Sequence, residues 1–113
     1  MTDPLPIVKG TLDALVLRAL SWGAMHSFEI MSWLEERSDG SLDVDDHALY
    51  QALHRMEGRG LIGAEWGATA NNRRARYYSV TDQGRAHLRA ETKKWVRYAD
   101  VVTDILTGPQ GSR

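Results

Sequence analysis

The stretch NNRRARYYSVTDQGR, residues 71–85, brings four arginines and two tyrosines together within fifteen residues. A solvated charged loop has no need of interleaved aromatic residues. If the stretch begins as a strand, its period of two places Arg74, Arg76, Tyr78 and Val80 on one face. The last two can then reach a core, while the arginines nearer the start project beyond it. We predict a strand with a buried base and a basic tip.

A second strand precedes this stretch. Residues 61–67, LIGAEWG, have the aromatic and aliphatic composition that is typical of strands. Between the two strands, Asn71 and Asn72 favour a turn. The pattern predicts a two-stranded ribbon whose tip carries the first three arginines of the stretch. A solvated hairpin tip is the alternative to a tip that contacts phosphate.

Two helices are predicted before residue 40. Residues 10–20, GTLDALVLRAL, space their apolar side chains along one helical face, and Thr11 can cap the first turn. After the glycine-containing SWGAM, Ser27 can cap a second helix that runs to about Arg37. Its apolar face is expected to comprise Phe28, Ile30, Met31 and Leu34.

A third helix follows a turn and short strand at residues 38–44, SDGSLDV. It should start at Asp45 or Asp46 and end at Gly60, which can take a left-handed capping conformation. One face of this helix is apolar, through Leu49, Leu53 and Met56. The other face carries the hydrogen-bonding side chains His47, Gln51, His54 and Arg55, which suit either an ordinary exposed surface or base edges in DNA. Tyr50 fits packing or phosphate contact equally.

The last predicted helix is longer than it must be to pack against the small domain that precedes it. Thr81 can cap it, and no proline interrupts it before Gly108, so it spans about 25 residues. Its apolar stripe resembles a heptad seam that only Glu91 interrupts. We expect a second copy of the chain to bury this stripe, through an interface of Leu12, Leu88, Trp95, Tyr98, Val102 and Ile105.

Composition sets the class of protein. The chain has 113 residues, of which 42% are hydrophobic and 26% charged, as is typical of one globular domain. Without cysteine it has no disulfides, thiolate metal sites or cysteine nucleophiles. No apolar run approaches the ~20 residues of a membrane span, and no signal peptide is recognisable. We expect a cytoplasmic protein without a membrane partner.

The formal net charge of −1 hides a local asymmetry. Residues 35–46 contain six acids and one base, which gives −5. Residues 54–94 contain nine bases and four acids, which gives +5 and favours a phosphate-facing surface.

The order helix, helix, short strand, helix and ribbon is that of a winged helix-turn-helix. The predicted fold is mainly α with a small β-wing, divided into a DNA-binding domain at 1–81 and a C-terminal dimerisation helix at 82–107. In this arrangement the third helix enters the major groove of double-stranded DNA, and the tip of the wing lies on the backbone or minor groove. The candidate DNA contacts are His47, Tyr50, Gln51, His54, Arg55, Arg73, Arg74, Arg76 and Arg85.

Five motifs also resemble a known family in order and spacing. GTLDALVLRAL, HSFEI, ALYQALHRMEGRGLI, EW and NNRRARYYSVTDQGR are similar to the PadR family of bacterial transcriptional regulators. The resemblance runs from about Lys9 to Leu106. It implies a homodimeric winged-helix repressor whose last helix makes the dimer.

The resemblance also implies a ligand. In short members that sense multiple drugs, a tryptophan of the last helix lines an apolar pore at the dimer interface, and Trp95 stands at that place. A small planar aromatic or cationic ligand is then expected; simple dimer packing is the alternative role of Trp95. The chain departs from the family at Ser27-Phe28, where Gly-Tyr is usual, and at Gln51, where proline is common.

Other function classes have less support. The chain has no glycine-rich phosphate loop, nucleophile elbow or concentrated acid–base set, so we do not expect an enzyme. His47 and His54 have no third ligand that spacing guarantees, so we expect no metal and no cofactor. Two functions remain. One is a dimeric, sequence-specific DNA-binding repressor that an aromatic ligand releases, and the alternative is a winged-helix module that binds protein. The basic tip favours the repressor.

Overall fold

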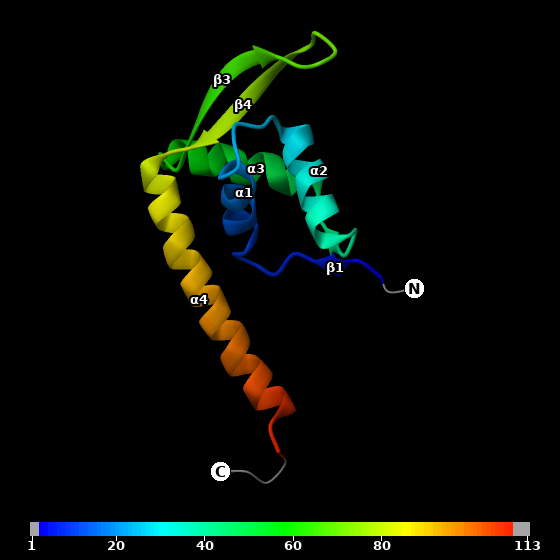
Figure 1. Cartoon of the computed structure of the whole chain (residues 1–113), viewed down its shortest axis with the longest axis vertical. Helices are drawn as coiled ribbons and strands as arrows, with labels where there is room; N and C mark the ends of the chain where they lie inside the picture. Colours follow the sequence, from blue (N-terminus) through cyan, green and yellow to red (C-terminus); the bar gives the residue numbers. More distant parts are fainter. Residues whose placement is uncertain (1–2, 110–113) are drawn as a thin grey trace.

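The computed structural model describes residues 3–109, and its fold is mainly α with a small β-wing, as the sequence predicts. Figure 1 shows α1–α3 gathered in one layer, with the ribbon of β3 and β4 projecting from one end and α4 extending from the other. The elements are β1 (Leu5–Pro6), α1 (Leu12–Leu20), α2 (Ser27–Ser38), β2 (Leu42–Asp43), α3 (Asp46–Gly58), β3 (Ile62–Ala68), β4 (Arg74–Val80) and α4 (Asp82–Thr107).

The core lies between α1, α2 and α3, and the base of the wing closes it. α1 contributes four buried residues, among which Val16 and Leu17 are fully buried. From β4, Tyr78 reaches the same core, as the period of two predicts. Phe28 does not join it: its side chain is 74% exposed, so the predicted apolar face of α2 is narrower and depends on Ile30 and Leu34.

Two predicted helix caps are wrong. His26, not Ser27, caps α2: its ring Nδ1 accepts a hydrogen bond from the Glu29 amide at 3.2 Å, and the Glu29 carboxylate accepts one from the His26 amide at 3.1 Å. This reciprocal pair satisfies two amides at once, which a serine one residue later cannot do. The Thr11 hydroxyl instead donates to the Val8 carbonyl at 2.7 Å and leaves the first turn of α1 uncapped.

The ends of α3 follow the predicted chemistry. Asp45 caps the N-terminus by accepting a hydrogen bond from the Ala48 amide at 3.0 Å. At the other end the helix stops at Gly58, two residues earlier than predicted, and Gly60 takes the left-handed conformation with φ of 75°. The Leu61 amide then donates to the Met56 carbonyl at 3.0 Å, as is typical of a helix end capped by a left-handed glycine.

The wing is an antiparallel pair, in which Trp66 lies opposite Arg76 and Ala64 lies opposite Tyr78. Its base is fixed to the helices because Met25 and Tyr78 exchange backbone hydrogen bonds of 3.0 and 2.8 Å. β1 and β2 pair in parallel and form a second small sheet. The sequence predicts a short strand near β2 but none at β1. Two residues that include a proline carry no period that could reveal a strand.

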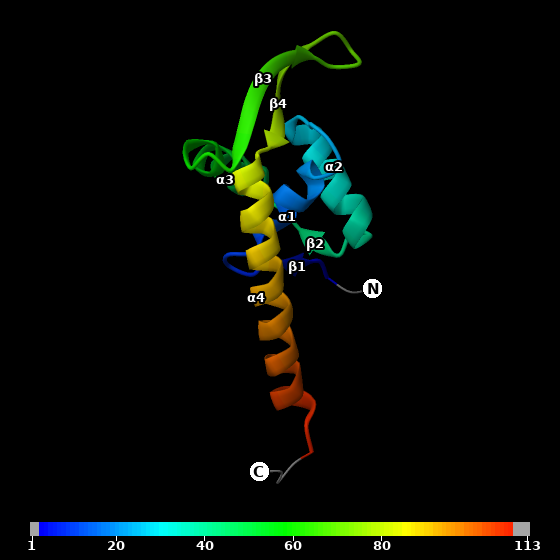
Figure 2. The same ribbon diagram turned by 60° about the vertical axis from the view of Figure 1, so that its left-hand side comes forward.

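The start of α4 is locked onto the end of α3. The Thr81 hydroxyl accepts a hydrogen bond from the Gly84 amide at 3.0 Å and donates toward the carbonyls of Gly60 and Leu61 at 2.7 and 3.0 Å. Gly84 is buried, and a Cβ built on it would overlap the Leu61 carbonyl oxygen. From this junction α4 runs past α1 and beyond the rest of the molecule, as Figure 2 shows.

This close approach predicts the effect of one added methyl group. Gly84→Ala should lower the free energy of unfolding by about 1–3 kcal/mol, because the new Cβ meets backbone that cannot move aside. The melting temperature, measured by circular dichroism, should fall by roughly 5–15 °C. Gly58→Ala is the matched control, since its Cβ would meet no atom within 4 Å. A Gly84→Ala variant with the same melting temperature as the native protein would contradict the close contact between Gly84 and the Leu61 carbonyl.

Candidate nucleic-acid interface

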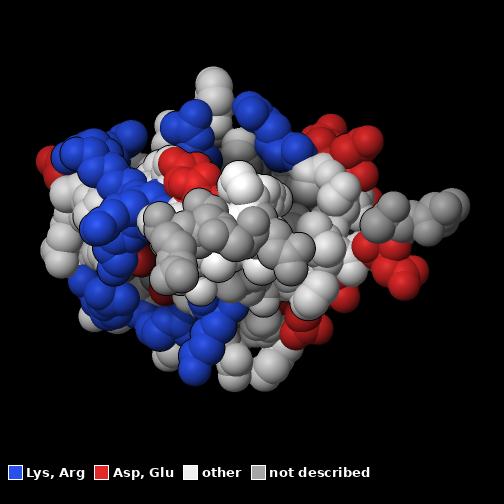
Figure 3. All heavy atoms as spheres, turned by 90° about the horizontal axis from the view of Figure 1, so that it is seen from below, with Lys and Arg blue, Asp and Glu red and all other residues white. Residues whose placement is uncertain are grey.

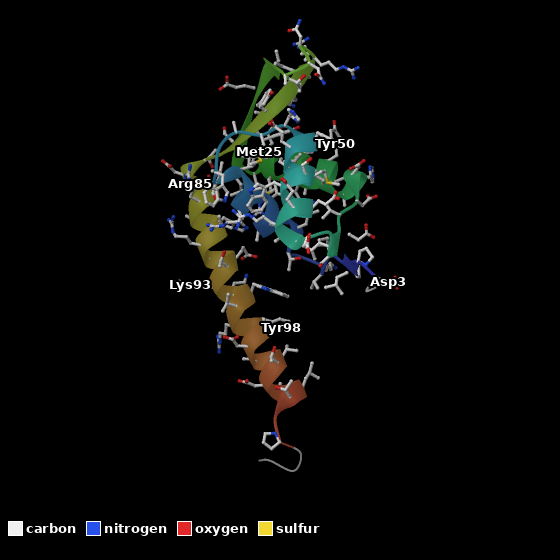
Figure 4. All side chains as sticks on the ribbon, turned by 45° about the vertical axis from the view of Figure 1, so that its right-hand side comes forward. Asp3, Met25, Tyr50, Arg85, Lys93 and Tyr98 are labelled. Atoms are coloured by element: carbon white, nitrogen blue, oxygen red, sulfur yellow. The ribbon has the colours of Figure 1, made fainter. Side chains whose placement is uncertain are left out.

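The exposed side of α3 presents four hydrogen-bonding side chains. His47, Tyr50, Gln51 and His54 are all exposed and lie at helical spacing, and we call this set the reading face. The opposite side of α3 is buried through Leu49, Ala52, Leu53 and Met56, so the core fixes the direction in which the reading face points. Tyr50, which Figure 4 labels, is 64% exposed, and this favours contact with a partner over packing.

The tip of the wing carries two exposed arginine side chains. Arg73 and Arg74 are exposed beside a turn in which Asn72 takes a left-handed φ of 60°. This turn is closed by the Asn72 amide, which donates to the Thr69 carbonyl at 2.8 Å. The guanidinium of Arg74 lies over the Trp66 ring at 4.4 Å, and this contact keeps the cation extended along the wing.

Two other predicted contacts are already paired within the chain. Arg76 lies below the tip, where its guanidinium bonds the Glu57 carboxylate of α3 at 2.8 Å. Arg55 forms an ion pair with Asp13 of α1. Sequence reasoning missed both acids, because each ion pair joins residues on different elements and no local pattern marks them.

Arg85 stands apart from the other candidates. It is exposed on the first turn of α4, and in Figure 4 it lies on the opposite side of the view from Tyr50. The Arg76–Glu57 ion pair joins the wing to the helix that carries the reading face, whereas Arg85 lies on α4. Its contact with DNA stays a prediction.

Charge is divided between two sides of the molecule. On the face seen from below in Figure 3, the visible Lys and Arg side chains gather mainly on the left and the visible Asp and Glu side chains mainly on the right. In the chain, residues 35–46, from the end of α2 through β2 to the start of α3, carry −5, and we call this segment the acidic side. Such a separation would orient the molecule toward a polyanion.

An apolar groove lies between α4, α1 and the segment before α1. Its volume is about 1320 Å³, and Leu15, Trp95 and Tyr98 are among its lining residues. The Trp95 and Tyr98 rings lie 6.2 Å apart on successive turns. Lys9, Arg18, Lys94 and Arg97 also line the groove, whereas its one acid, Glu91, is bonded to Lys94 at 3.0 Å. That hydrogen bond lowers the pKa of Glu91.

The described part of the chain contains neither a metal site nor a membrane-spanning helix. Within residues 3–109, no three His, Cys, Asp or Glu side chains come together as a metal site would require. The same part of the chain contains no helix of the length and apolarity needed to cross a membrane.

Three helices followed by a two-stranded wing define a winged helix-turn-helix protein, and comparison with known proteins gives its family. The model of the "Transcriptional regulator PadR-like family" matches residues 16–90, about two thirds of the chain. The chain belongs to this family, whose members are DNA-binding transcriptional regulators and not enzymes. This assignment favours DNA binding over a module that binds only protein.

Solved structures agree with the assignment. A PadR-like transcriptional regulator from Bacillus cereus is 25% identical, with a TM-score of 0.75 over 89% of this chain and 96% of that one. A PadR family transcription regulator from Clostridium difficile is 26% identical, with a TM-score of 0.74 over 86% and 99% of the two chains. The Streptococcus mutans protein smu.1704 shares the fold at 23% identity, with a TM-score of 0.81 over 96% and 98%.

The exposed wing tip generates a test of phosphate contact. Replacing Arg73 and Arg74 with glutamine should weaken binding to every DNA sequence alike, and each lost phosphate contact should reduce the slope of log affinity against log salt by roughly one. Fluorescence anisotropy at several salt concentrations measures both quantities. Arg37→Gln is the control, because Arg37 lies on α2 beside Trp33, away from the wing tip. An unchanged slope in the double variant would identify the tip as a solvated loop.

Proposed function

We propose that this regulator is a homodimeric, sequence-specific repressor in which α3 reads the major groove and the wing tip holds the flanking backbone or minor groove. The division of the chain follows from this function. Residues 1–81 bind DNA, and residues 82–107 join two copies. A repressor of this kind acts by occupying its operator.

One observation carries the proposal: a helix face made of hydrogen-bonding side chains and a cationic wing tip stand on two elements that the Arg76–Glu57 ion pair joins. Gln51 is suited to adenine, whose N7 and N6 form a bidentate pair with an amide. Histidine and tyrosine on the same face can bond bases or phosphates. Base contacts would supply selectivity, and the arginines of the tip would supply affinity that depends on salt.

The argument for a dimer rests on α4. Its apolar stripe continues past the domain, and Ile105 is 75% exposed in the single chain. Trp95, Tyr98 and Leu106 are exposed on the same helix, whereas Leu12 and Leu88 are partly covered by the core of their own chain. A second copy that packs against α4 and the groove would bury these side chains together, which is favourable by about 25 cal/mol per Å² of apolar surface.

The argument for a ligand rests on the groove. Its Trp95 and Tyr98 rings offer apolar faces, and four basic residues and one acid line the same groove. The sequence predicts a ligand that is a planar aromatic compound or a cation. The net positive charge of the groove favours an aromatic compound that carries a negative charge over a cation. Binding releases the operator only if the ligand prefers a spacing of the two α4 helices in which the α3 helices no longer match successive grooves.

The main test of the proposal is selectivity. DNA selected by the native protein from a random duplex library provides the operator, and a random-sequence duplex provides the reference. Gln51→Ala and His54→Ala should each reduce the preference for the operator by about 1–3 kcal/mol while leaving reference binding nearly unchanged. Glu36→Ala, on the acidic side, is the control. Equal losses on both duplexes would mean that another face enters the groove.

The dimer has a test that needs no DNA. Light scattering of the native protein should give about twice the chain mass of 12.7 kDa. The pair Val102→Asp and Ile105→Asp should give a monomer or unfolded chain, because burial of unpaired carboxylates is costly. Lys93→Asp with Thr103→Asp places the same groups elsewhere on α4 and should leave the dimer intact. A native monomer contradicts the proposal.

The ligand is tested with phenolic carboxylates and planar cationic dyes. The carboxylates should quench tryptophan fluorescence and weaken operator binding in the native protein but not in Trp95→Ala. A tenfold weaker operator complex corresponds to a coupling of about 1.4 kcal/mol, within the usual allosteric range. Failure of every compound, or binding that survives in Trp95→Ala, would assign Trp95 to dimer packing and leave the DNA-binding proposal standing.

A further inference from the structure

Arg76 occupies a closed position between the wing and α3. Its guanidinium bonds the Glu57 carboxylate at 2.8 Å and lies 5.8 Å from the Trp66 ring and 6.0 Å from the Tyr78 ring. Its Nε is buried and has no hydrogen-bond partner within residues 3–109. The Arg76 and Glu57 side chains are only 39% and 32% exposed. Each of these features withdraws the cation from solvent.

Both ends of this contact belong to the DNA-binding surface. Glu57 follows His54 by one turn of α3, and Arg76 follows Arg74 on the same face of β4. The ion pair therefore joins the element that reads bases to the element that carries the arginine tip.

We infer that Glu57 and Arg76 form a strut that fixes the angle between α3 and the wing, and that Arg76 is a positioning residue rather than a phosphate contact. This inference rests on the proposed sequence-specific binding. A planar guanidinium that bonds a carboxylate and lies within about 6 Å of two aromatic rings has one favoured orientation, which a flexible ammonium group lacks. With the angle fixed, the reading face can engage base edges while the wing tip stays on the backbone, and selectivity depends on both contacts at once.

The two roles of Arg76 predict opposite effects of removing Glu57. If Arg76 leaves Glu57 to bind phosphate, the carboxylate competes with DNA, and Glu57→Gln tightens binding to every duplex. If the pair is a strut, Glu57→Gln loosens the wing and weakens binding to the selected operator alone. The sign of the effect therefore distinguishes the roles, although the substitution removes the same negative charge in both cases.

The experiment measures anisotropy on the selected operator and on the random duplex at several salt concentrations. Glu57→Gln and Arg76→Gln should each lower operator affinity about tenfold and leave random binding no weaker. The double variant should lose no more than either single variant, since both break one interaction. The salt slope should not change. Arg76→Lys should bind like Arg76→Gln, because lysine retains the charge but not the planar group that fixes the orientation of the contact.

Glu65→Gln is the matched control, because it removes an exposed wing carboxylate that is bonded to no cation within residues 3–109, and it should bind like the native protein. Equal melting temperatures would establish that the variants fold. Operator binding by Glu57→Gln that is unchanged or tighter would overturn the strut. So would an Arg76→Gln slope that falls by roughly one and is restored by lysine. A native protein that selects no sequence would contradict the proposed function as well.

Discussion

The carbonyl oxygen of Leu61 is the point on which the arrangement of the molecule depends. It accepts hydrogen bonds from the Thr81 amide and hydroxyl at 3.1 and 3.0 Å, and Gly84 fits against it. α3 has just ended there, the wing begins and ends there, and α4 starts there. Because these elements meet at one junction, a change in the spacing of the two α4 helices of the proposed dimer would be transmitted to the reading face and the wing.

Around this junction, polar contacts have separate tasks. The Schellman turn at Gly60 and the Thr81 cap set where the helices stop and start, and the Met25–Tyr78 bridge fixes the base of the wing. The ion pairs of Arg55 and Arg76 then hold α3 against α1 and the wing. The cations left at the wing tip are those that can meet phosphate without breaking an internal contact.

Local sequence signals predicted every element except β1, because each of the predicted elements has a local cause. The period of two in residues 74–80 places Tyr78 in the core, and Gly60 and Thr81 punctuate the chain where sequence chemistry requires it. The same reasoning could not find the partner of Arg76, since 19 residues separate it from Glu57. It also expected a serine to cap α2 because histidine is not among the usual capping residues. The sequence could thus name candidate residues for the surface, whose contact with DNA stays a prediction, but it could not name the contacts that position them.

The central claim is that the reading face and the wing tip meet DNA together. The chain has no cysteine, so a single cysteine can carry a DNA-cleaving iron chelate at one chosen position. Attached through Gly58→Cys, at the exposed end of α3, the chelate should cut within the selected operator, and through Asn72→Cys it should cut at its flanks. Through Asp39→Cys, on the acidic side, it should not cut. Cleavage from Asp39→Cys that equals cleavage from Gly58→Cys would contradict the account.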